Sequence, residues 1–267
     1  MRKIVSAVAA TLACVSGSAL AESPRDSYWA ELSYFYPTIS STARLDRRST
    51  ARPGTSISLE DELDLDDRKG TPYVALGMRL GERWRMEFEY YQLNRSSSRS
   101  IRRQIEWGDV TYPVGVTLDS TFDTTVYRLT GGYSFYKAPE AEAGVGFGLH
   151  VTDFTTALSR QSGVATVDRE ARDTLVPLPT LGLYGTYVMS EQFQLRGRVD
   201  YLSLKYGDYD GSLINGLVAL DWRFAKNWGA GVGYRYVDYT LEATTSKFFG
   251  EINYKFKGPT LFVNAGF

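Results

Sequence analysis

The sequence predicts an all-β protein: an antiparallel, up-and-down transmembrane β-barrel of about ten strands, an even number. Three observations support this prediction. The last ten residues, GPTLFVNAGF, alternate so that Phe267, Ala265, Val263, Leu261 and Pro259 share one nearly pure apolar face of a strand. Short and longer connections alternate along the chain, as they do between the strands of such barrels. Within the alternating stretches, charged residues keep to one face and apolar residues to the other.

The terminal strand is expected to close the barrel. In a soluble protein, a strand with so apolar a face would favour aggregation. In a barrel, lipid contacts that face and the first strand pairs with the free edge. We therefore predict that Phe267, the aromatic last residue, acts as an assembly signal.

Residues 1–21 predict a secretory signal peptide that is cleaved from the mature chain. Two basic residues precede an apolar run over residues 4–15, and residues 19–21 form a cleavage site of the A-x-A type. Residues 22–267 are then expected to form a single barrel domain. The only cysteine, Cys14, lies in the segment to be removed, so disulfides are excluded as a source of stability.

The charge balance gives no indication of a nucleic-acid partner. The 30 Lys and Arg residues are matched by 31 Asp and Glu residues, for a formal net charge of −1. The chain is rich in Tyr, Gly, Thr and Val, and shows little helical periodicity. This composition leaves a barrel or a secreted β-sandwich as the candidates, and we favour the barrel.

Ten stretches show strand-type alternation. In chain order, the predicted strands are 27–38, 71–80, 84–94, 114–136, 141–158, 173–188, 192–206, 212–225, 228–242 and 248–267. Short turns are expected at 81–83, 137–140, 190–192 and 226–227. Longer connections are expected at 39–70, 95–113, 159–172, 207–211 and 243–247. An even number of strands places both chain ends on the short-turn side.

The cost of exposing charge to lipid decides which face of each strand points inward. An arginine that faces lipid at the middle of a bilayer costs about 2–4 kcal/mol, so the charged face must line the lumen. On strand 84–94, this places Trp84, Met86 and Phe88 outside and Arg85 and Glu87 inside. A girdle of aromatic residues is predicted beside the short turns, at Trp84, Phe135, Phe193, Trp228 and Phe267.

Charged residues of both signs are predicted to share the half of the lumen near the short turns. They are Glu31, Arg79, Arg85, Glu87, Glu89, Arg128, Arg196, Arg198, Asp200, Asp221, Arg223 and Arg235. Such a set can line a polar channel, or it can pair into a network that fills a narrow barrel. We favour the network, which would plug the lumen.

The polarity of the two faces inverts toward the other end of five strands. The strands keep their register, yet the outward residues become polar and the inward residues become apolar. We interpret this as strands that cross the apolar band and then continue past the bilayer, where water lies outside. The predicted apolar upper interior comprises Phe122, Phe154, Leu158, Leu202, Leu204, Val237, Tyr239, Tyr254 and Phe256. It is expected to form a packed cap or, alternatively, a pocket for a small hydrophobic molecule.

The single histidine, His150, is predicted to point into the lumen. Paired with an acid or a hydroxyl, it would be a candidate catalytic residue. Thr152, Glu89 and Asp200 are possible companions, but no local motif supports a pairing. We therefore expect a hydrogen-bonding role and predict no catalytic residue.

An acidic run, EDELDLDD, occupies residues 60–67. Its alternate oxygen ligands suit a calcium ion, but the glycine of an EF-hand loop is missing. Ile57, Leu59, Leu63 and Leu65 alternate with polar residues, which suggests an amphipathic strand or lid at the barrel mouth, or else a solvated loop. Two groups of arginines can pair with this run or bind lipopolysaccharide phosphates. These are Arg44, Arg47, Arg48 and Arg52, and Arg95, Arg99, Arg102 and Arg103.

The signal peptide and the terminal strand resemble those of small Gram-negative outer-membrane β-barrel proteins, the group that includes the OmpA-type transmembrane domain, OmpW-like and opacity-type proteins. The resemblance implies location in the bacterial outer membrane and does not imply one activity. We expect a non-enzymatic monomer without metal or cofactor, with outer-membrane lipid, lipopolysaccharide and the barrel assembly machinery as partners. The alternative is a barrel enzyme that modifies lipid A or cleaves peptides through His150.

Overall fold

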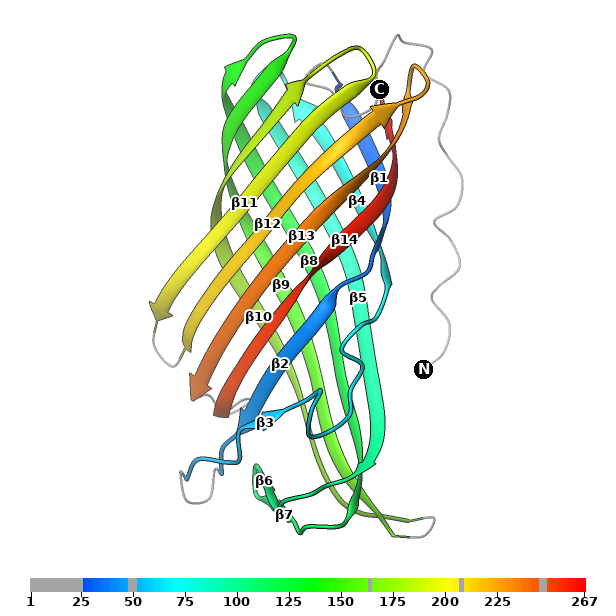
Figure 1. The fold of residues 1–267 in the computed structure, drawn as a ribbon. Coiled ribbons are helices and arrows are strands. Elements are labelled where there is room, and N and C mark those ends of the chain that lie inside the picture. The colour runs from blue at the N-terminus through cyan, green and yellow to red at the C-terminus, as the bar shows by residue number, and fades with distance from the viewer. Residues whose placement is uncertain (1–25, 48–51, 163–164, 207–208, 245–248) are drawn as a thin grey trace.

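The computed structural model describes residues 26–47, 52–162, 165–206, 209–244 and 249–267, and side chains are not described at 161–176, 206 or 209. The described chain contains fourteen strands (Figure 1). Their bounds are β1 Tyr28–Phe35, β2 Thr38–Leu45, β3 Ile57–Ser58, β4 Thr71–Leu80, β5 Trp84–Ser100, β6 Ile105–Trp107, β7 Val110–Tyr112, β8 Thr117–Lys137, β9 Ala141–Ser162, β10 Ala165–Val188, β11 Phe193–Tyr206, β12 Tyr209–Arg223, β13 Trp228–Thr244 and β14 Phe249–Gly266. Among the described residues, no helix is long and apolar enough to cross a membrane.

Ten of these strands form a closed antiparallel ring, which confirms the predicted fold class and strand number. Its order is β1-β4-β5-β8-β9-β10-β11-β12-β13-β14, and β14 pairs with β1 to close it. The closing register places Leu32 opposite Val263. Phe267 continues the closure because its carbonyl accepts hydrogen bonds from the amides of Ser27 and Tyr28, at 2.7 and 2.9 Å. The expected signal peptide lies outside the described residues.

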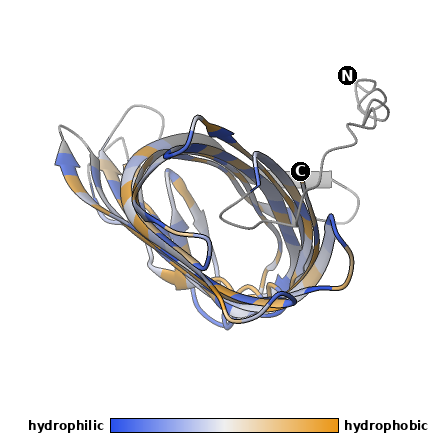
Figure 2. Ribbon diagram, turned by 90° about the horizontal axis from the view of Figure 1, so that it is seen from above, coloured by the Kyte–Doolittle hydropathy of each residue, from blue (hydrophilic) through white to orange (hydrophobic). Residues whose placement is uncertain are grey.

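The outer surface of the ring carries an apolar band near the short-turn end, which is uppermost in Figure 1. Seen along the barrel axis in Figure 2, apolar and polar residues alternate along the strands of the wall. The most exposed large apolar side chain of the band is Leu181, at 71%. Tyr90 and Tyr127, whose ring centroids lie 5.2 Å apart, also face outward. Side chains in this band face lipid in a transmembrane barrel.

The first strand of the ring is interrupted at Tyr36 and Pro37. β1 pairs with β14 and β4, but its continuation β2 pairs with β14 on one side and with the short β3 on the other. Gly258 of β14 lies against the interruption, since a Cβ atom there would come within 2.4 Å of the Tyr36 carbonyl oxygen. The prediction for this region was wrong in part, because residues 39–45 were expected to begin a long connection.

Other strands also continue further than predicted at the long-loop end. β5 reaches Ser100, and β10 begins at Ala165. The pairing between β10 and β11, however, ends at Leu181 and Tyr201, and the tips of the two hairpins diverge (Figure 1). Pro177 and Pro179 of β10 account for the point at which its pairing with β11 ends. Because the ladder with β9 is continuous through both prolines, their ring nitrogens, which carry no hydrogen, lie on the β11 side.

Candidate functional site

The lumen near the short-turn end contains a network of ion pairs centred on Glu89 of β5. Three arginines from three other strands contact its carboxylate. Arg235 lies at 2.6 Å, Arg198 at 2.7 Å and Arg128 at 3.0 Å. Arg128 and Arg235 are each only 1% exposed. Successive residues of a strand point alternately to the lumen and to lipid. Glu89 and the three arginines occupy inward-facing positions on β5, β8, β11 and β13, so their side chains meet in the lumen.

Asp200 extends the network across β11. Its carboxylate lies 3.0 Å from Arg128 and 3.2 Å from Arg198. Asn215 of β12 donates a hydrogen bond to Asp200 at 3.2 Å and accepts one from Arg235 at 3.3 Å. Asn215 was not predicted, although its inward position on strand 212–225 would have identified it. A buried charge is tolerated only when it is paired and hydrogen-bonded in this way.

The remaining predicted lumen charges lie nearer the short turns. Glu87 pairs with Arg85, and also with Arg198 at 3.1 Å. Arg196 contacts both Glu31 and Asp221, the latter at 3.0 Å. A further pair joins Arg79 to Glu142 at 2.6 Å. Sequence reasoning missed Glu142, which lies two residues after a short turn where the strand register is hard to fix.

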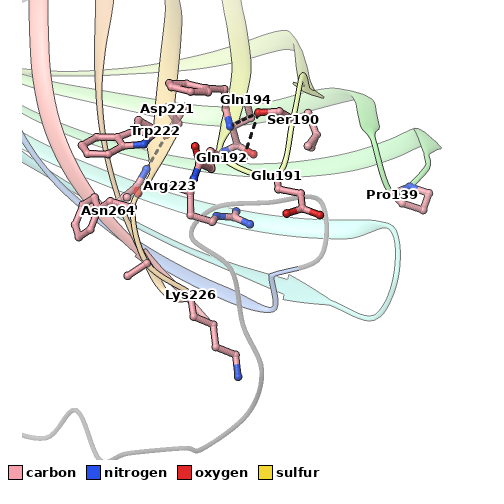
Figure 3. A pocket seen from close by; sticks show the side chains of 15 residues that line it. Pro139, Ser190, Glu191, Gln192, Gln194, Asp221, Trp222, Arg223, Lys226 and Asn264 are labelled. Atoms are coloured by element: carbon pink, nitrogen blue, oxygen red, sulfur yellow. Dashed lines mark hydrogen bonds between the residues drawn. The ribbon is translucent and has the colours of Figure 1, made fainter.

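Arg223 lies at the rim of a hollow of about 470 Å³ at the short-turn end (Figure 3). The hollow is bounded by the turn between β10 and β11, by the turn between β12 and β13, and by Asn264 of β14. Two cavities beside the charge network are far smaller, at about 10 and 40 Å³. We call the large hollow the vestibule. Asp221 and Asn264 are among the residues that line it.

On the other side of the network lies an aromatic cluster. Phe154 is 1% exposed, and its ring centroid lies 5.2 Å from that of Tyr239, 5.9 Å from Phe122 and 6.2 Å from Tyr254. The other members of the predicted apolar interior that are also buried are Leu158, Val237 and Phe256. Leu202 is partly buried and packs against them. Rings at these distances pack against one another.

Leu204 was wrongly assigned to this interior, because its side chain is 43% exposed. It lies beyond Tyr201, where β11 no longer pairs with β10 and retains only β12 as a neighbour. A side chain at an inward-facing position is buried only where its strand pairs with a neighbouring strand on each side. The sequence pattern alone could not show that the wall opens here.

Two arginines connect the aromatic cluster to the polar regions around it. The Arg235 guanidinium lies over the rings of Tyr73 and Tyr91, at 5.2 and 5.4 Å from their centroids. Arg95 lies over Tyr254 at 5.4 Å, and over a second ring of the cluster. Such stacking stabilises a guanidinium that has been removed from water. The two arginines therefore link the charge network and the lid to the aromatic cluster.

Residues 57–66 cover the cluster where β2 and β5 do not pair, and we call this segment the lid. Its four apolar side chains are buried in the cluster; they are Ile57, Leu59, Leu63 and Leu65. Glu60 accepts hydrogen bonds from the amide and the hydroxyl of Ser41, at 2.8 and 2.5 Å, and from Arg95 at 2.5 Å. The amphipathic alternative for this stretch describes the structure better than a solvated loop does.

The arginines of the next connection pair with the lid. Arg99 lies 3.0 Å from Asp64, and Arg103 lies 2.7 Å from Glu62. Burial raises the pKa of Glu62, but the hydrogen bonds from Arg103 and the Ser58 amide more than offset this and hold the pKa below its usual value. Within the described residues, no group of three or more His, Cys, Asp or Glu side chains is placed to hold a metal ion.

His150 lies between the charge network and the aromatic cluster. It is 2% exposed, and its register partners are Arg128 on β8 and Leu178 on β10.

Comparisons with known proteins agree with this architecture. Residues 7–267 match the family model described as the outer membrane protein beta-barrel domain. Among solved structures, the outer membrane protease OmpT from Escherichia coli is similar, with a TM-score of 0.61 and 13% identity over 91% of this chain and 97% of that one. The attachment invasion locus protein Ail of Yersinia pestis has a TM-score of 0.36 and 9% identity, over 88% and 99% of the two chains. No curated protein matches the chain. At such identities, the structural likeness shows the fold alone.

Proposed function

The chain belongs to the outer membrane protein β-barrel family and is a bacterial outer-membrane protein, and from this premise we propose that it is a sealed, non-enzymatic barrel. The proposal is supported by the ion pairs around Glu89 and by the aromatic cluster, both of which lie inside the ring of strands. The ion pairs around Glu89 occupy the part within the apolar band, and the aromatic cluster occupies the part beyond it. The short turns of such barrels face the periplasm, so the cluster and the lid face the cell exterior.

A packed cap is better supported than a pocket for a small hydrophobic molecule. The rings of the cluster contact one another directly, and Phe122 and Phe154 are at most 2% exposed. A cavity between the lid, β8 and β9 has a volume of only about 10 Å³. Even one water molecule needs about 10–15 Å³, so an acyl chain would have to displace part of the cluster.

The alternative of an enzyme that uses His150 has less support. The imidazole lies between two closed layers, whereas acid–base catalysis needs a group within hydrogen-bond reach of the substrate. The possible companion Glu89 is already held by three arginines. Comparing lipid A from cells with and without the protein by mass spectrometry would test this alternative. A mass shift that disappears in His150→Ala would overturn the non-enzymatic proposal.

Conductance measurements test the seal. The purified chain in a planar bilayer should show no steady conductance. The variant Glu89→Ala leaves three arginines without their shared partner, and it should produce current fluctuations as charged side chains seek water. The matched control Glu82→Ala lies in a short turn outside the lumen and should remain silent. A large, stable conductance of the unmodified protein would contradict the seal.

A further inference from the structure

The outer surface of the barrel changes from apolar to polar where β14 runs beside β1 and β2, which lie side by side with it in Figure 1. On the short-turn side of this change, Tyr34 and its register partner Leu261 are exposed. On the long-loop side, the outward register partners are Ser40 and Lys255. Such a change marks the edge of the apolar band, where lipid headgroups lie. Because the short turns face the periplasm, this edge lies in the outer leaflet.

Two cations lie in one row across this edge. Thr38 of β2 pairs with Lys257 of β14 on one side and, through an isolated bridge, with Arg68 on the other. Residues directly opposite each other in antiparallel strands share a face, with Cβ atoms about 5 Å apart. All three side chains are exposed on the outer surface. Arg68 and Lys257 therefore flank Thr38, with their Cβ atoms about 10 Å apart, and both long side chains can reach a group placed over Thr38.

Neither cation has a partner among the described residues. The side chains of Arg68 and Lys257 form no ion pair and no hydrogen bond within the described part of the chain. The carboxylate that faces outward on the neighbouring β13 belongs to Asp238. It is already held by Lys255 at 2.9 Å and by the Tyr236 hydroxyl at 2.8 Å. The row through Thr38 therefore presents positive charge that the protein does not balance.

Four arginines that the sequence suggested for lipopolysaccharide phosphates are engaged with carboxylates instead. Arg44 pairs with Glu251 at 3.1 Å, and Arg95, Arg99 and Arg103 pair with the lid. Their charge is largely compensated, so they attract a further anion less than an unpaired cation does.

We propose that Arg68 and Lys257, with Thr38 between them, bind a phosphate group of an outer-leaflet lipid. A guanidinium can hold two phosphate oxygens through parallel hydrogen bonds, and an ammonium adds a compact positive charge. The acyl chains of such a lipid would lie along the exposed apolar surface around Leu261, which favours a lipid over a free phosphate. The site is on the outer wall of the barrel. The proposal is therefore independent of whether the lumen is sealed, and conductance does not test it.

Native mass spectrometry of the full chain, released from detergent micelles, tests the proposal with purified lipid A as the probe. We expect a saturable lipid adduct on the unmodified chain. Lipid A from which the phosphates have been removed keeps its acyl chains and should bind about tenfold more weakly, because it loses the charge-assisted contacts. Inorganic phosphate at the same concentration as the lipid should not displace the adduct, because it makes no apolar contact.

Substitution of the two cations assigns the binding to this row. Arg68→Gln and Lys257→Gln should each weaken lipid A binding about fivefold, the effect of one basic residue at a membrane surface, and the double variant about 25-fold. The control Lys205→Gln removes an exposed lysine of β11 that already pairs with Asp210 at 3.2 Å, and it should bind like the unmodified chain. Heat-modifiable gel mobility checks that each variant is folded. The comparison of the two lipids on the unmodified chain needs no variant.

Any of four results would overturn the proposal. The first is the absence of a saturable lipid A adduct on the unmodified chain. The second is equal affinity for lipid A and its phosphate-free form. The third is displacement of lipid A by an equal concentration of inorganic phosphate, which would assign the two cations to a free anion. The fourth is a folded double variant that binds lipid A as tightly as the Lys205→Gln control.

Discussion

Arg95 and Glu60 form a buried ion pair that fastens the lid to the barrel wall. The Nη1 and Oε1 atoms lie 2.5 Å apart, and the side chains are 0% and 10% exposed. Arg95 comes from β5, and Glu60 from a segment that does not belong to the ring of paired strands. Side-chain contacts therefore take the place of strand pairing along this edge of β5, with the Leu63 carbonyl accepting a further hydrogen bond from Ser97.

We predict that Glu60→Ala lowers the free energy of unfolding by about 3–5 kcal/mol, because it leaves the Arg95 charge buried without a partner. Guanidinium unfolding in micelles, followed by tryptophan fluorescence, measures the change. The double variant Glu60→Leu with Arg95→Met should recover most of the loss, since an apolar pair removes the unpaired charge. The exposed pair offers the control: Glu62→Ala should cost less than about 1 kcal/mol. Equal losses in the two single variants would contradict a special role for Glu60.

Acid should loosen the lid through Glu62. The pKa of this carboxyl is lower in the folded protein than in the unfolded chain, so its contribution to stability is complete above the unfolded pKa. The contribution is lost as the pH falls through the folded pKa, below the usual glutamate range. Hydrogen exchange of residues 57–66 should accelerate between neutral pH and about pH 3, after correction for the intrinsic exchange rate. In Glu62→Gln this acceleration should be smaller, and an unchanged profile would exclude Glu62 as a source.

The sequence predicted those features that depend on a single strand and missed those that depend on its neighbours. The cost of charge in lipid was enough to place Arg128 and Arg235 in the lumen, and the structure brings both to Glu89. The exposure of Leu204 depends on where β10 and β11 separate. The alternation of residues within β11 gives no information about that point. The continuation of the first strand past Pro37 depends on the partner Gly258, more than two hundred residues away in the sequence.

The extent of the strands was underestimated for a related reason. Residues 95–100 of β5 carry mainly arginine and serine, so they show no apolar alternation. They remain in a strand because β8 pairs with them on one side and the lid covers them on the other. The lid could be predicted as amphipathic from its leucines, but its place against β5 could not.

Removal of Phe267 should impair assembly. Its backbone makes three hydrogen bonds with the start of the first strand, two through its carbonyl and one at 2.8 Å from its amide to the Tyr28 carbonyl. Loss of these bonds frees the closing edge of the barrel, where unpaired backbone groups in lipid are costly. We expect a marked fall in folded protein in outer-membrane fractions, measured by heat-modifiable mobility. Phe267→Tyr keeps the backbone and the aromatic ring and should assemble normally. Normal levels of the truncated chain would contradict the prediction.

Restoring two amide hydrogens should extend the β10–β11 ladder. In the double variant Pro177→Val with Pro179→Val, the backbone regains donors on the edge that faces β11. Hydrogen exchange at residues 202–205 of β11 should then slow, because these residues gain a second neighbouring strand. Pro72→Val, a change within the paired part of β4, is the control and should leave residues 202–205 unaffected. Unchanged exchange in the double variant would mean that the hairpins separate for another reason.

Phe154 distinguishes a packed cap from a ligand pocket. Its ring contacts three other aromatic rings and is 1% exposed, so Phe154→Ala should leave a cavity and lower the free energy of unfolding by about 3–5 kcal/mol. Chemical unfolding in micelles measures the loss. The neighbouring Asp153 lies on the opposite face of β9, so Asp153→Ala should change stability by less than about 0.5 kcal/mol. A pocket predicts the reverse for Phe154, namely little loss of stability together with altered binding of a fluorescent fatty acid. If Phe154→Ala cost less than about 1 kcal/mol, the ring would lie in loose surroundings and the barrel would not be capped by packing.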